Sequence, residues 1–361
     1  MKNNMIDLLF VLLLVLFFYR AELVKPLRLL NSGGYLSVNT GKYYRGFFAI
    51  VVVFHHLAQR TETGIAFRYF TSVGYLAVAF FFFLSGYGLQ KSYITKYDRY
   101  RKGFILKRIP TILIPYIIIT AIYWLMYFIG DKYYSLKDIG IAIVNGSPIV
   151  SHSWYIICIL AFYVVFWLIM TTCRKHYFLM ILCGTVWYFL YAVFCVKMGY
   201  GSWWYNASHL LIVGMFWATY EKPILELLYR TYQFFAPFTW FSFVVLFLFH
   251  GKIAAIVNLP YISLILTLVT AILFVLSVIM FSLKVQIGNK ILEFLGEISL
   301  EIYISQGLFM TTLRSGWIYI NNELLWCILV LTGTIVFSHC LHKVFQYIFS
   351  KYKCLLHNLK I

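Results

Sequence analysis

The sequence predicts an all-α integral membrane protein, a polytopic bundle of about ten or eleven transmembrane helices. Of its 361 residues, 62% are hydrophobic, 20% are aromatic and only 12% are charged. Several apolar runs approach the roughly 20 residues that a helix needs to cross a hydrocarbon core about 30 Å thick. These runs are continuously apolar and lack the alternation of barrel strands, so helices rather than a β-barrel satisfy the backbone hydrogen bonds in lipid.

Eleven apolar runs are interpreted as spans, within one domain that covers residues 1–361. The runs cover residues 5–18, 46–58, 70–90, 109–129, 154–172, 177–196, 207–220, 233–249, 261–283, 294–313 and 324–348. We divide the domain into an extra N-terminal span and linker (1–40), a core (41–348) and a cytoplasmic tail (349–361). The first run is short, but Arg20-Ala21-Glu22 is a poor cleavage site, so we expect a span rather than a signal peptide.

The charges indicate how the chain is oriented. The formal net charge is +18, which in a soluble protein would suggest nucleic acid. Here the basic residues lie between the spans, and no nucleic-acid partner is expected. If the N-terminus is outside, 21 of the 30 Lys and Arg residues fall in inner segments and 8 in outer segments. The positive-inside rule therefore predicts a multi-pass protein of the cytoplasmic (inner) membrane, with its C-terminus inside.

The run from Tyr44 to Leu57 contains an arginine and two histidines. On a helix, Arg45 and His56 lie within roughly 20° of the same face with about 16 Å of rise between them, whereas His55 points about 80° away. If Arg45 lies at the cytoplasmic surface, His56 lies near the middle of the bilayer. An ionisable group at that depth indicates a functional site that lines a cavity. The alternative is a buried histidine bonded to a neighbouring helix.

The apolar part of this run is short, and Gln59, Arg60, Thr61 and Glu62 follow directly. Either the helix ends early or its outer end faces a water-filled cleft, and polar residues at membrane depth favour the cleft. Local bilayer thinning is the alternative. In a cleft, Arg60 and Glu62 would contact a substrate that enters from outside.

A basic loop follows the third run, and it includes Lys102, Lys107 and Arg108. One explanation of its charge is that the basic residues only fix the orientation of the chain in the membrane. The other is a cytoplasmic site for a ligand that carries phosphates, because arginine forms bidentate bonds to phosphate oxygens. Just before this loop, Ser85 and Gly86 would allow close contact between helices.

Two further groups are candidates for a site. Glu297 and Glu301 share a helical face, and Glu301 could orient His56 or bind acceptor hydroxyls. Glu297 is expected to balance Lys290 at the inner surface. Trp154, with Trp204 and Asn206 at an outer end, could stack against or bond a sugar ring, but the aromatic belt of membrane proteins explains tryptophans there as well. The seven cysteines show no CxxC spacing, so neither a disulfide framework nor a metal site is predicted.

Several short motifs occur in a fixed order along the chain. The first is Arg45 and His56, separated by ten residues, and the second is Phe82-Phe83-Leu84-Ser85-Gly86-Tyr87. The third runs from Phe104 through Lys107-Arg108 to Pro115-Tyr116. The last two are Ser153-Trp154-Tyr155 and the segment from Leu295 to Tyr303. Together these motifs resemble the membrane-bound acyltransferase 3 family. The resemblance implies an O-acyltransferase that moves an acyl group, acetyl in the simplest case, from cytoplasmic acyl-CoA to a hydroxyl of an envelope or secreted carbohydrate, without a metal.

The chemistry assigns roles to the first motif. Acyl transfer to a hydroxyl needs a general base, and histidine is the usual one because its pKa lies near neutrality. His56 is the expected base, and Arg45 would hold a donor phosphate, with Lys102, Lys107 and Arg108, or orient the helix of the base. The chain departs from the family pattern at Thr111, where a second arginine is common, and at Gln306, where a histidine is common.

Two other classes of function remain open. A transporter or flippase of glycan precursors would also be helical and basic with polar residues at mid-membrane depth, but it should show repeat symmetry, and the sequence has no clear repeat. A structural partner in an envelope complex is the third class. The sequence leaves the acceptor, the acyl chain and any homo-oligomer undetermined.

Overall fold

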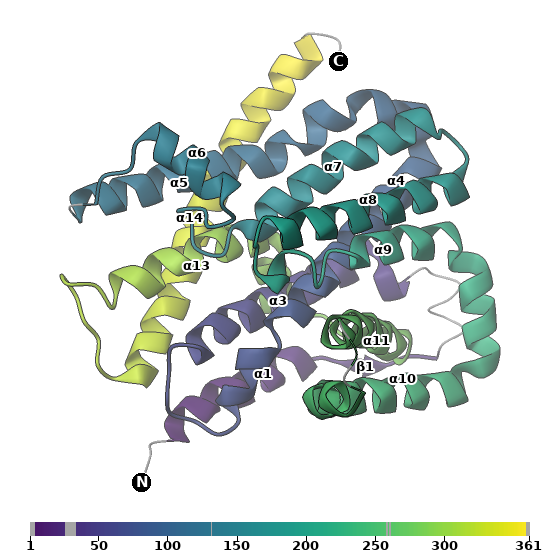
Figure 1. The fold of residues 1–361 in the computed structure, drawn as a ribbon, viewed down its shortest axis with the longest axis horizontal. Coiled ribbons are helices and arrows are strands. Elements are labelled where there is room, and N and C mark those ends of the chain that lie inside the picture. The colour runs from purple at the N-terminus through teal and green to yellow at the C-terminus, as the bar shows by residue number, and fades with distance from the viewer. Residues whose placement is uncertain (1–3, 26–33, 131, 258, 260, 359–361) are drawn as a thin grey trace.

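The computed structural model describes residues 4–25, 34–130, 132–257, 259 and 261–358, and within them the protein is a bundle of α-helices (Figure 1). The α-helices are α1 (Asp7–Phe18), α3 (Val38–Ala58), α4 (Gly74–Arg108), α5 (Pro110–Ile129), α6 (Leu136–Val144), α7 (Trp154–Thr172), α8 (Tyr177–Lys197), α9 (Leu210–Thr219), α10 (Glu221–Val257), α11 (Ile262–Lys284), α12 (Lys290–Glu297), α13 (Ser299–Thr312) and α14 (Glu323–Asn358). The short elements are the 3₁₀ helices η1 (Asn4–Ile6), η2 (Gly34–Leu36), η3 (Phe67–Ser72) and η4 (Ser202–Trp204), with an antiparallel pair of two-residue strands, β1 (Glu22–Leu23) and β2 (Val285–Gln286). The all-α membrane fold class is confirmed.

The number of full spans differs from the eleven predicted. In the described part of the chain, six helical stretches are long and apolar enough to cross a membrane, and the first of them, Gly74–Ile129, contains both α4 and α5. Two predicted spans, α1 and α9, are only 12 and 10 residues long. Ten residues rise about 15 Å, half of the hydrocarbon thickness. The run 294–313 divides into α12 and α13, which meet at Ile298.

Helix α9 is apolar because protein surrounds it. A Cβ atom on Gly214 would collide with the backbone carbonyl of Phe83 on α4, and one on Gly86 would collide with the carbonyl of Leu211 on α9. The two glycines therefore let the backbones of α4 and α9 touch, as small residues do at helix contacts in membranes. The close contact predicted at Gly86 is confirmed, and it explains why a short helix buried in protein was mistaken for a span.

The two ends of the described chain lie on opposite sides of the bundle (Figure 1). The carboxylate of Asp7, at the start of α1, accepts hydrogen bonds of 3.0 and 2.8 Å from the backbone amides of Ile65 and Phe67. At the other side, the hydroxyl of Tyr352 near the end of α14 donates to the carbonyl of Leu106 at 3.0 Å. We call the side of Asp7 the outer side and the side of Tyr352 the inner side, after the orientation that the charges predict.

Helix α3 runs through the centre of this bundle from the inner to the outer side. It begins at Ser37, whose hydroxyl accepts from the amide of Thr40 at 3.1 Å, and continues without interruption to Ala58, which is longer than the predicted run 46–58. Helix α12 packs closely along it, because a Cβ atom on Gly46 would collide with the carbonyl of Leu292. Arg45 and His56 therefore lie on one rigid helix.

Helix α4 continues to Arg108 on the inner side, so the basic segment predicted as a loop is helical. Its 35 residues would rise about 53 Å if straight, but the helix bends at Tyr97, which has the non-helical backbone angles φ 25° and ψ −101°. Tyr97 thus separates the part that packs in the bundle from the basic segment that ends at Arg108. Helix α4 ends at Arg108, and α5 begins almost directly after it, at Pro110.

Candidate active site

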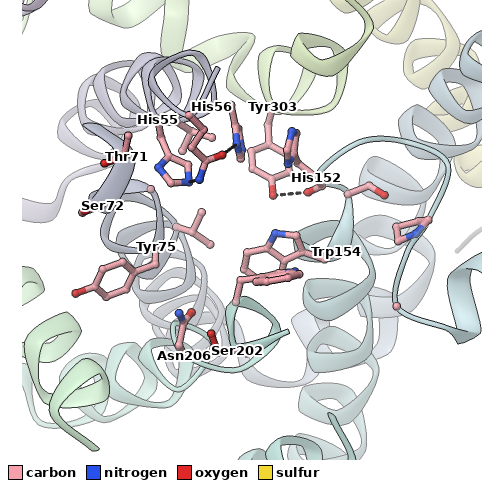
Figure 2. Close-up of a pocket in the computed structure, with 18 of the residues that line it drawn as sticks. His55, His56, Thr71, Ser72, Tyr75, His152, Trp154, Ser202, Asn206 and Tyr303 are labelled. Atoms are coloured by element: carbon pink, nitrogen blue, oxygen red, sulfur yellow. Dashed lines mark hydrogen bonds between the residues drawn. The ribbon is translucent and has the colours of Figure 1, made fainter. Parts of the chain in front are cut away.

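A cavity of about 570 Å³ lies at the outer end of α3 (Figure 2). Five parts of the chain form it: the end of α3, the η3–α4 junction, the loop before α7, the η4 turn and helix α13. The lining residues are Val52, His55, His56, Gln59, Thr71, Ser72, Gly74, Tyr75, Val78, Gly146, Ser147, Pro148, His152, Ser153, Trp154, Ser202, Trp203, Asn206 and Tyr303. We call this space the outer cavity. Helix α3 has 21 residues and does not end early, and of the two alternatives considered for its outer end, a cavity is the one present.

Both histidines of α3 line the outer cavity, and one glutamine joins them. Nδ1 of His55 lies 2.9 Å from the carbonyl oxygen of Phe70, and its Nε2 lies 3.2 Å from Nε2 of Gln59. Nδ1 of His56 lies 3.4 Å from Oε1 of Gln59. His55 thus packs against the neighbouring segment, as expected from its helical phase, but it also faces the cavity beside His56 (Figure 2).

The ring of His56 stacks against that of His152, with the centroids 3.5 Å apart and the planes 19° from parallel. His152 has a φ of 64°, a left-handed backbone that non-glycine residues adopt mainly where the surroundings enforce it. Its carbonyl oxygen accepts a hydrogen bond of 2.7 Å from the hydroxyl of Tyr303. Burial, followed by the charges of Arg60 and His55, lowers the pKa of His152 to about 3. His152 therefore stays neutral at physiological pH and supports the His56 ring without adding charge.

The far wall of the outer cavity is aromatic and polar, with Trp154 and Trp203 near Asn206. Asn206 is 9% exposed, and its Oδ1 is buried without a hydrogen-bond partner among the described residues. Trp154 and Asn206, both candidates for substrate contact, lie on this wall. Trp204, by contrast, is 2% exposed and packs against Tyr200 with ring centroids 4.8 Å apart, and its neighbour Trp203 lines the cavity.

Arg60 and Glu62 lie beyond the end of α3 and do not line the outer cavity. The backbone amide of Glu62 donates to the carboxylate of Glu323 at 2.8 Å, and the carbonyl of Arg60 accepts from Nη1 of Arg314 at 2.6 Å. Both residues therefore belong to a connection between the α3 loop and the start of α14. Arg60 is still close enough to influence His152 electrostatically.

Arg45 lies on the inner half of α3, about 16 Å of helix rise from His56. Its side chain is half-buried, and its electrostatic neighbours are the hydroxyls of Tyr155 and Tyr163 on α7. The salt bridges of the described residues do not include Arg45. It is thus a cation inside the bundle whose charge no described carboxylate neutralises.

A second cavity, of about 520 Å³, lies on the inner side along the last part of α4. Its lining residues are Lys96, Arg99, Tyr100, Gly103, Phe104, Lys107 and Arg108, and we call it the inner basic pocket. The guanidinium of Arg108 lies 5.9 Å from the ring centroid of Tyr100. None of the four cations of this pocket takes part in the salt bridges of the described residues. Lys107 and Arg108 therefore lie where predicted, whereas Lys102 is exposed and outside the lining.

Tyr163 connects Arg45 with the inner basic pocket. It is an electrostatic neighbour of Arg45 and of Tyr100, and its ring centroid lies 6.1 Å from that of Phe104, a pocket residue. Arg45 lines neither cavity. Its other electrostatic neighbour, Tyr155, packs against Tyr303 of the outer cavity, with ring centroids 5.2 Å apart.

The acidic candidates lie elsewhere. Glu301 is buried, and its Oε1 lies 2.8 Å from Nδ1 of His342 on α14, so its partner is His342 and not His56. Glu297 pairs with Lys42 on α3 at 2.9 Å, so its partner is Lys42 and not the predicted Lys290. Gln306, where the family often has a histidine, is fully buried and donates to the carbonyl of Tyr303.

The sequence analysis gave no sign of several contributors to the outer cavity, among them Tyr303, the η3–α4 junction and the bridging role of Gln59. Tyr303 closes the motif that begins at Leu295, but a tyrosine on an apolar helix gives no sign of the direction in which it points. Among the described residues, no group of three or more His, Cys, Asp or Glu side chains could hold a metal ion.

The family comparison agrees with this arrangement. The model of the acyltransferase 3 family, described as an acyltransferase domain, matches residues 42–343, which is most of the chain and includes both cavities. No curated protein and no solved structure matches the sequence. The chain therefore belongs to the acyltransferase 3 family and is a multi-pass membrane acyltransferase.

Proposed function

We propose that this acyltransferase moves an acetyl group from cytoplasmic acetyl-CoA to a hydroxyl of an envelope carbohydrate in the inner membrane, with His56 as the general base. The observation that carries the proposal is the position of His56 at the end of α3, in the wall of a cavity of aromatic and hydrogen-bonding side chains. An aromatic face and neutral polar groups suit a sugar ring, which offers apolar C–H faces and hydroxyls.

The reaction needs one proton acceptor. His56 takes the proton of the acceptor hydroxyl as its oxygen attacks the carbonyl carbon of the thioester. The carbon–sulfur bond then breaks, and the protonated His56 returns the proton to the departing CoA sulfur. A general base of this kind contributes about 10²–10⁴-fold to the rate.

The donor would be held from the inner side. The phosphates of CoA suit the inner basic pocket, because Lys107 and Arg108 are unpaired by described carboxylates and arginine binds phosphate through parallel hydrogen bonds. Arg45 would attract the donor further into the bundle. The linear pantetheine arm would then cover the distance of about 16 Å along α3 from Arg45 to His56.

The acceptor would enter from the outer side. Trp154 and Trp203 would pack on its ring, and the unpaired Oδ1 of Asn206 would accept a hydrogen bond from one of its hydroxyls. This arrangement lets the two substrates reach one base from opposite sides of the membrane.

The test uses membranes from cells that express the full chain, given radiolabelled acetyl-CoA with and without cell-surface glycan. We expect label in the glycan only when both substrates and the wild-type chain are present. If the chain instead moves glycan precursors across the membrane without incorporating label, the proposal fails and the transporter interpretation replaces it. Label that appears equally in membranes without the chain would also overturn it.

A further inference from the structure

We propose that Gln59 and His55 are positioning residues that set the tautomer of His56, so that Nε2 of His56 is the nitrogen that accepts the proton. The inference rests on the proposed role of His56 and adds which of its two nitrogens reacts and what holds it there. A neutral imidazole has one N–H and one lone pair, and only the nitrogen with the lone pair can act as a base.

The chain of hydrogen bonds starts at the carbonyl oxygen of Phe70, which can only accept. Nδ1 of His55 lies 2.9 Å from this oxygen, so the proton of a neutral His55 is on Nδ1 and its Nε2 has a lone pair. The ring of His55 lies directly over Gly74, where even a Cβ atom would collide with it. The ring is thus held in place, and Phe70 fixes its tautomer.

The second link is the amide of Gln59. Because Nε2 of His55 is an acceptor, the group 3.2 Å away must be the donating NH₂ of Gln59. The carbonyl Oε1 of the same amide then faces Nδ1 of His56, at 3.4 Å. An amide oxygen can only accept, so His56 donates from Nδ1 and its lone pair is on Nε2.

The remaining contacts of His56 agree with this assignment. Its ring face is covered by His152 at a centroid distance of 3.5 Å, so the ring reacts through its edge. Nε2 of His56 has no hydrogen-bond partner among the described residues, whereas Nδ1 has one. During acyl transfer, Nε2 would receive the hydroxyl proton while the Nδ1–H bond to Gln59 persists, and Nε2 would then return the proton to the CoA sulfur.

The first measurement is the tautomer itself. The full chain, labelled with ¹⁵N-histidine in lipid bilayers, is examined by solid-state NMR, and the His56 signals are identified by their loss in His56→Ala. We expect a protonated Nδ1 and an unprotonated Nε2 in the wild type, and a mixture of tautomers in Gln59→Leu. An unprotonated Nδ1 in the wild type would overturn the proposal without any activity assay.

The second measurement tests whether Gln59 positions His56 or only caps the end of α3. Gln59→Leu should lower kcat about 3- to 10-fold, the equivalent of one lost hydrogen bond, with both KM values unchanged. Gln59→Glu keeps an oxygen toward His56 and should retain most of kcat, whereas loss of a cap alone would affect both variants equally.

The third measurement is a double-mutant cycle. His55→Phe keeps a ring of similar shape but cannot orient the amide of Gln59, so it should lower kcat by a few fold in the wild type and have no further effect in Gln59→Leu. Additive losses would show that His55 acts independently and would overturn the relay. If His56→Ala keeps activity while the tautomer is as expected, the proposed function fails and the hydrogen-bond assignment stands.

Discussion

The outer cavity and the inner basic pocket have similar volumes, about 570 and 520 Å³, but they are built in different ways. Five separate parts of the chain form the outer cavity, and its described lining contains no Lys, Arg, Asp or Glu. The inner basic pocket comes from one segment, Lys96 to Arg108, and presents four cations. The difference suits the two proposed ligands: a neutral carbohydrate held by shape and hydrogen bonds outside, and the anionic CoA held by charge inside.

This comparison predicts that salt affects the two binding sites differently. Binding of CoA at the inner basic pocket should weaken as ionic strength rises, because the Debye length falls from about 10 Å at 0.1 M to about 3 Å at 1 M. The KM for a neutral glycan should change little.

The largest expected effect of a substitution is in the outer cavity. His56→Ala should lower acetyl transfer about 10²–10⁴-fold, because it removes the base, while CoA binding stays unchanged. His55→Ala is the matched control, and it should remain within about 10-fold of the wild type because it loses only a positioning hydrogen bond. Acetyl incorporation into glycan is measured at matched expression. A dead His55→Ala beside an active His56→Ala would contradict the assignment of the base.

The next effect is at the inner basic pocket. Arg108→Gln should weaken CoA binding about 10- to 100-fold, since a hydrogen bond to a charged group contributes about 1.5–3 kcal/mol. Lys102→Gln removes the same charge from an exposed position outside the lining and should change binding less than about 3-fold. Arg60→Gln on the outer side gives a second control. Binding of CoA to the purified chain is the measurement, and equal losses in the three variants would exclude a local site.

The same difference explains what could be predicted from the sequence. Lys107 and Arg108 are neighbours in the chain, so a local charge pattern was enough to find the inner basic pocket. His56 was found because a helix has a fixed period that relates it to Arg45. His152 stacks on His56 from about 100 residues further along the chain, and Tyr303, about 250 residues further along, bonds to His152. No local sequence pattern predicts these long-range contacts.

Two differences between the prediction and the structure have a common physical cause. Trp204 was named as a contact residue although it is buried, and α9 was interpreted as a full span, because apolar residues look alike whether lipid or protein surrounds them. Only the packed structure shows that Trp204 lies under Tyr200 and that α9 lies against α4 at Gly86 and Gly214.

The two tryptophans provide a test of that correction. Trp203 is 53% exposed and lines the outer cavity, whereas Trp204 is 2% exposed and does not. Trp203→Ala should raise the KM for glycan about 3- to 10-fold through lost stacking, with little change in thermal stability. Trp204→Ala should instead destabilise the fold by about 3–5 kcal/mol, as expected for a buried tryptophan. Thermal unfolding and glycan KM are measured for both, and the reverse pattern would restore Trp204 as the contact residue.

The smallest effect is expected at Asn206, and the informative result is whether a substitution there raises or lowers thermal stability. Oδ1 of Asn206 is buried without a partner among the described residues, and such a group costs about 1–3 kcal/mol in desolvation. Asn206→Leu has nearly the same shape and removes this cost, so the variant should unfold at a higher temperature than the wild type. If Oδ1 accepts a hydrogen bond from a glycan hydroxyl, the same variant should raise the glycan KM about 2- to 5-fold and leave CoA binding unchanged. Higher stability combined with weaker acceptor binding would identify Asn206 as a ligand group, whereas lower stability with an unchanged KM would make it part of the packing.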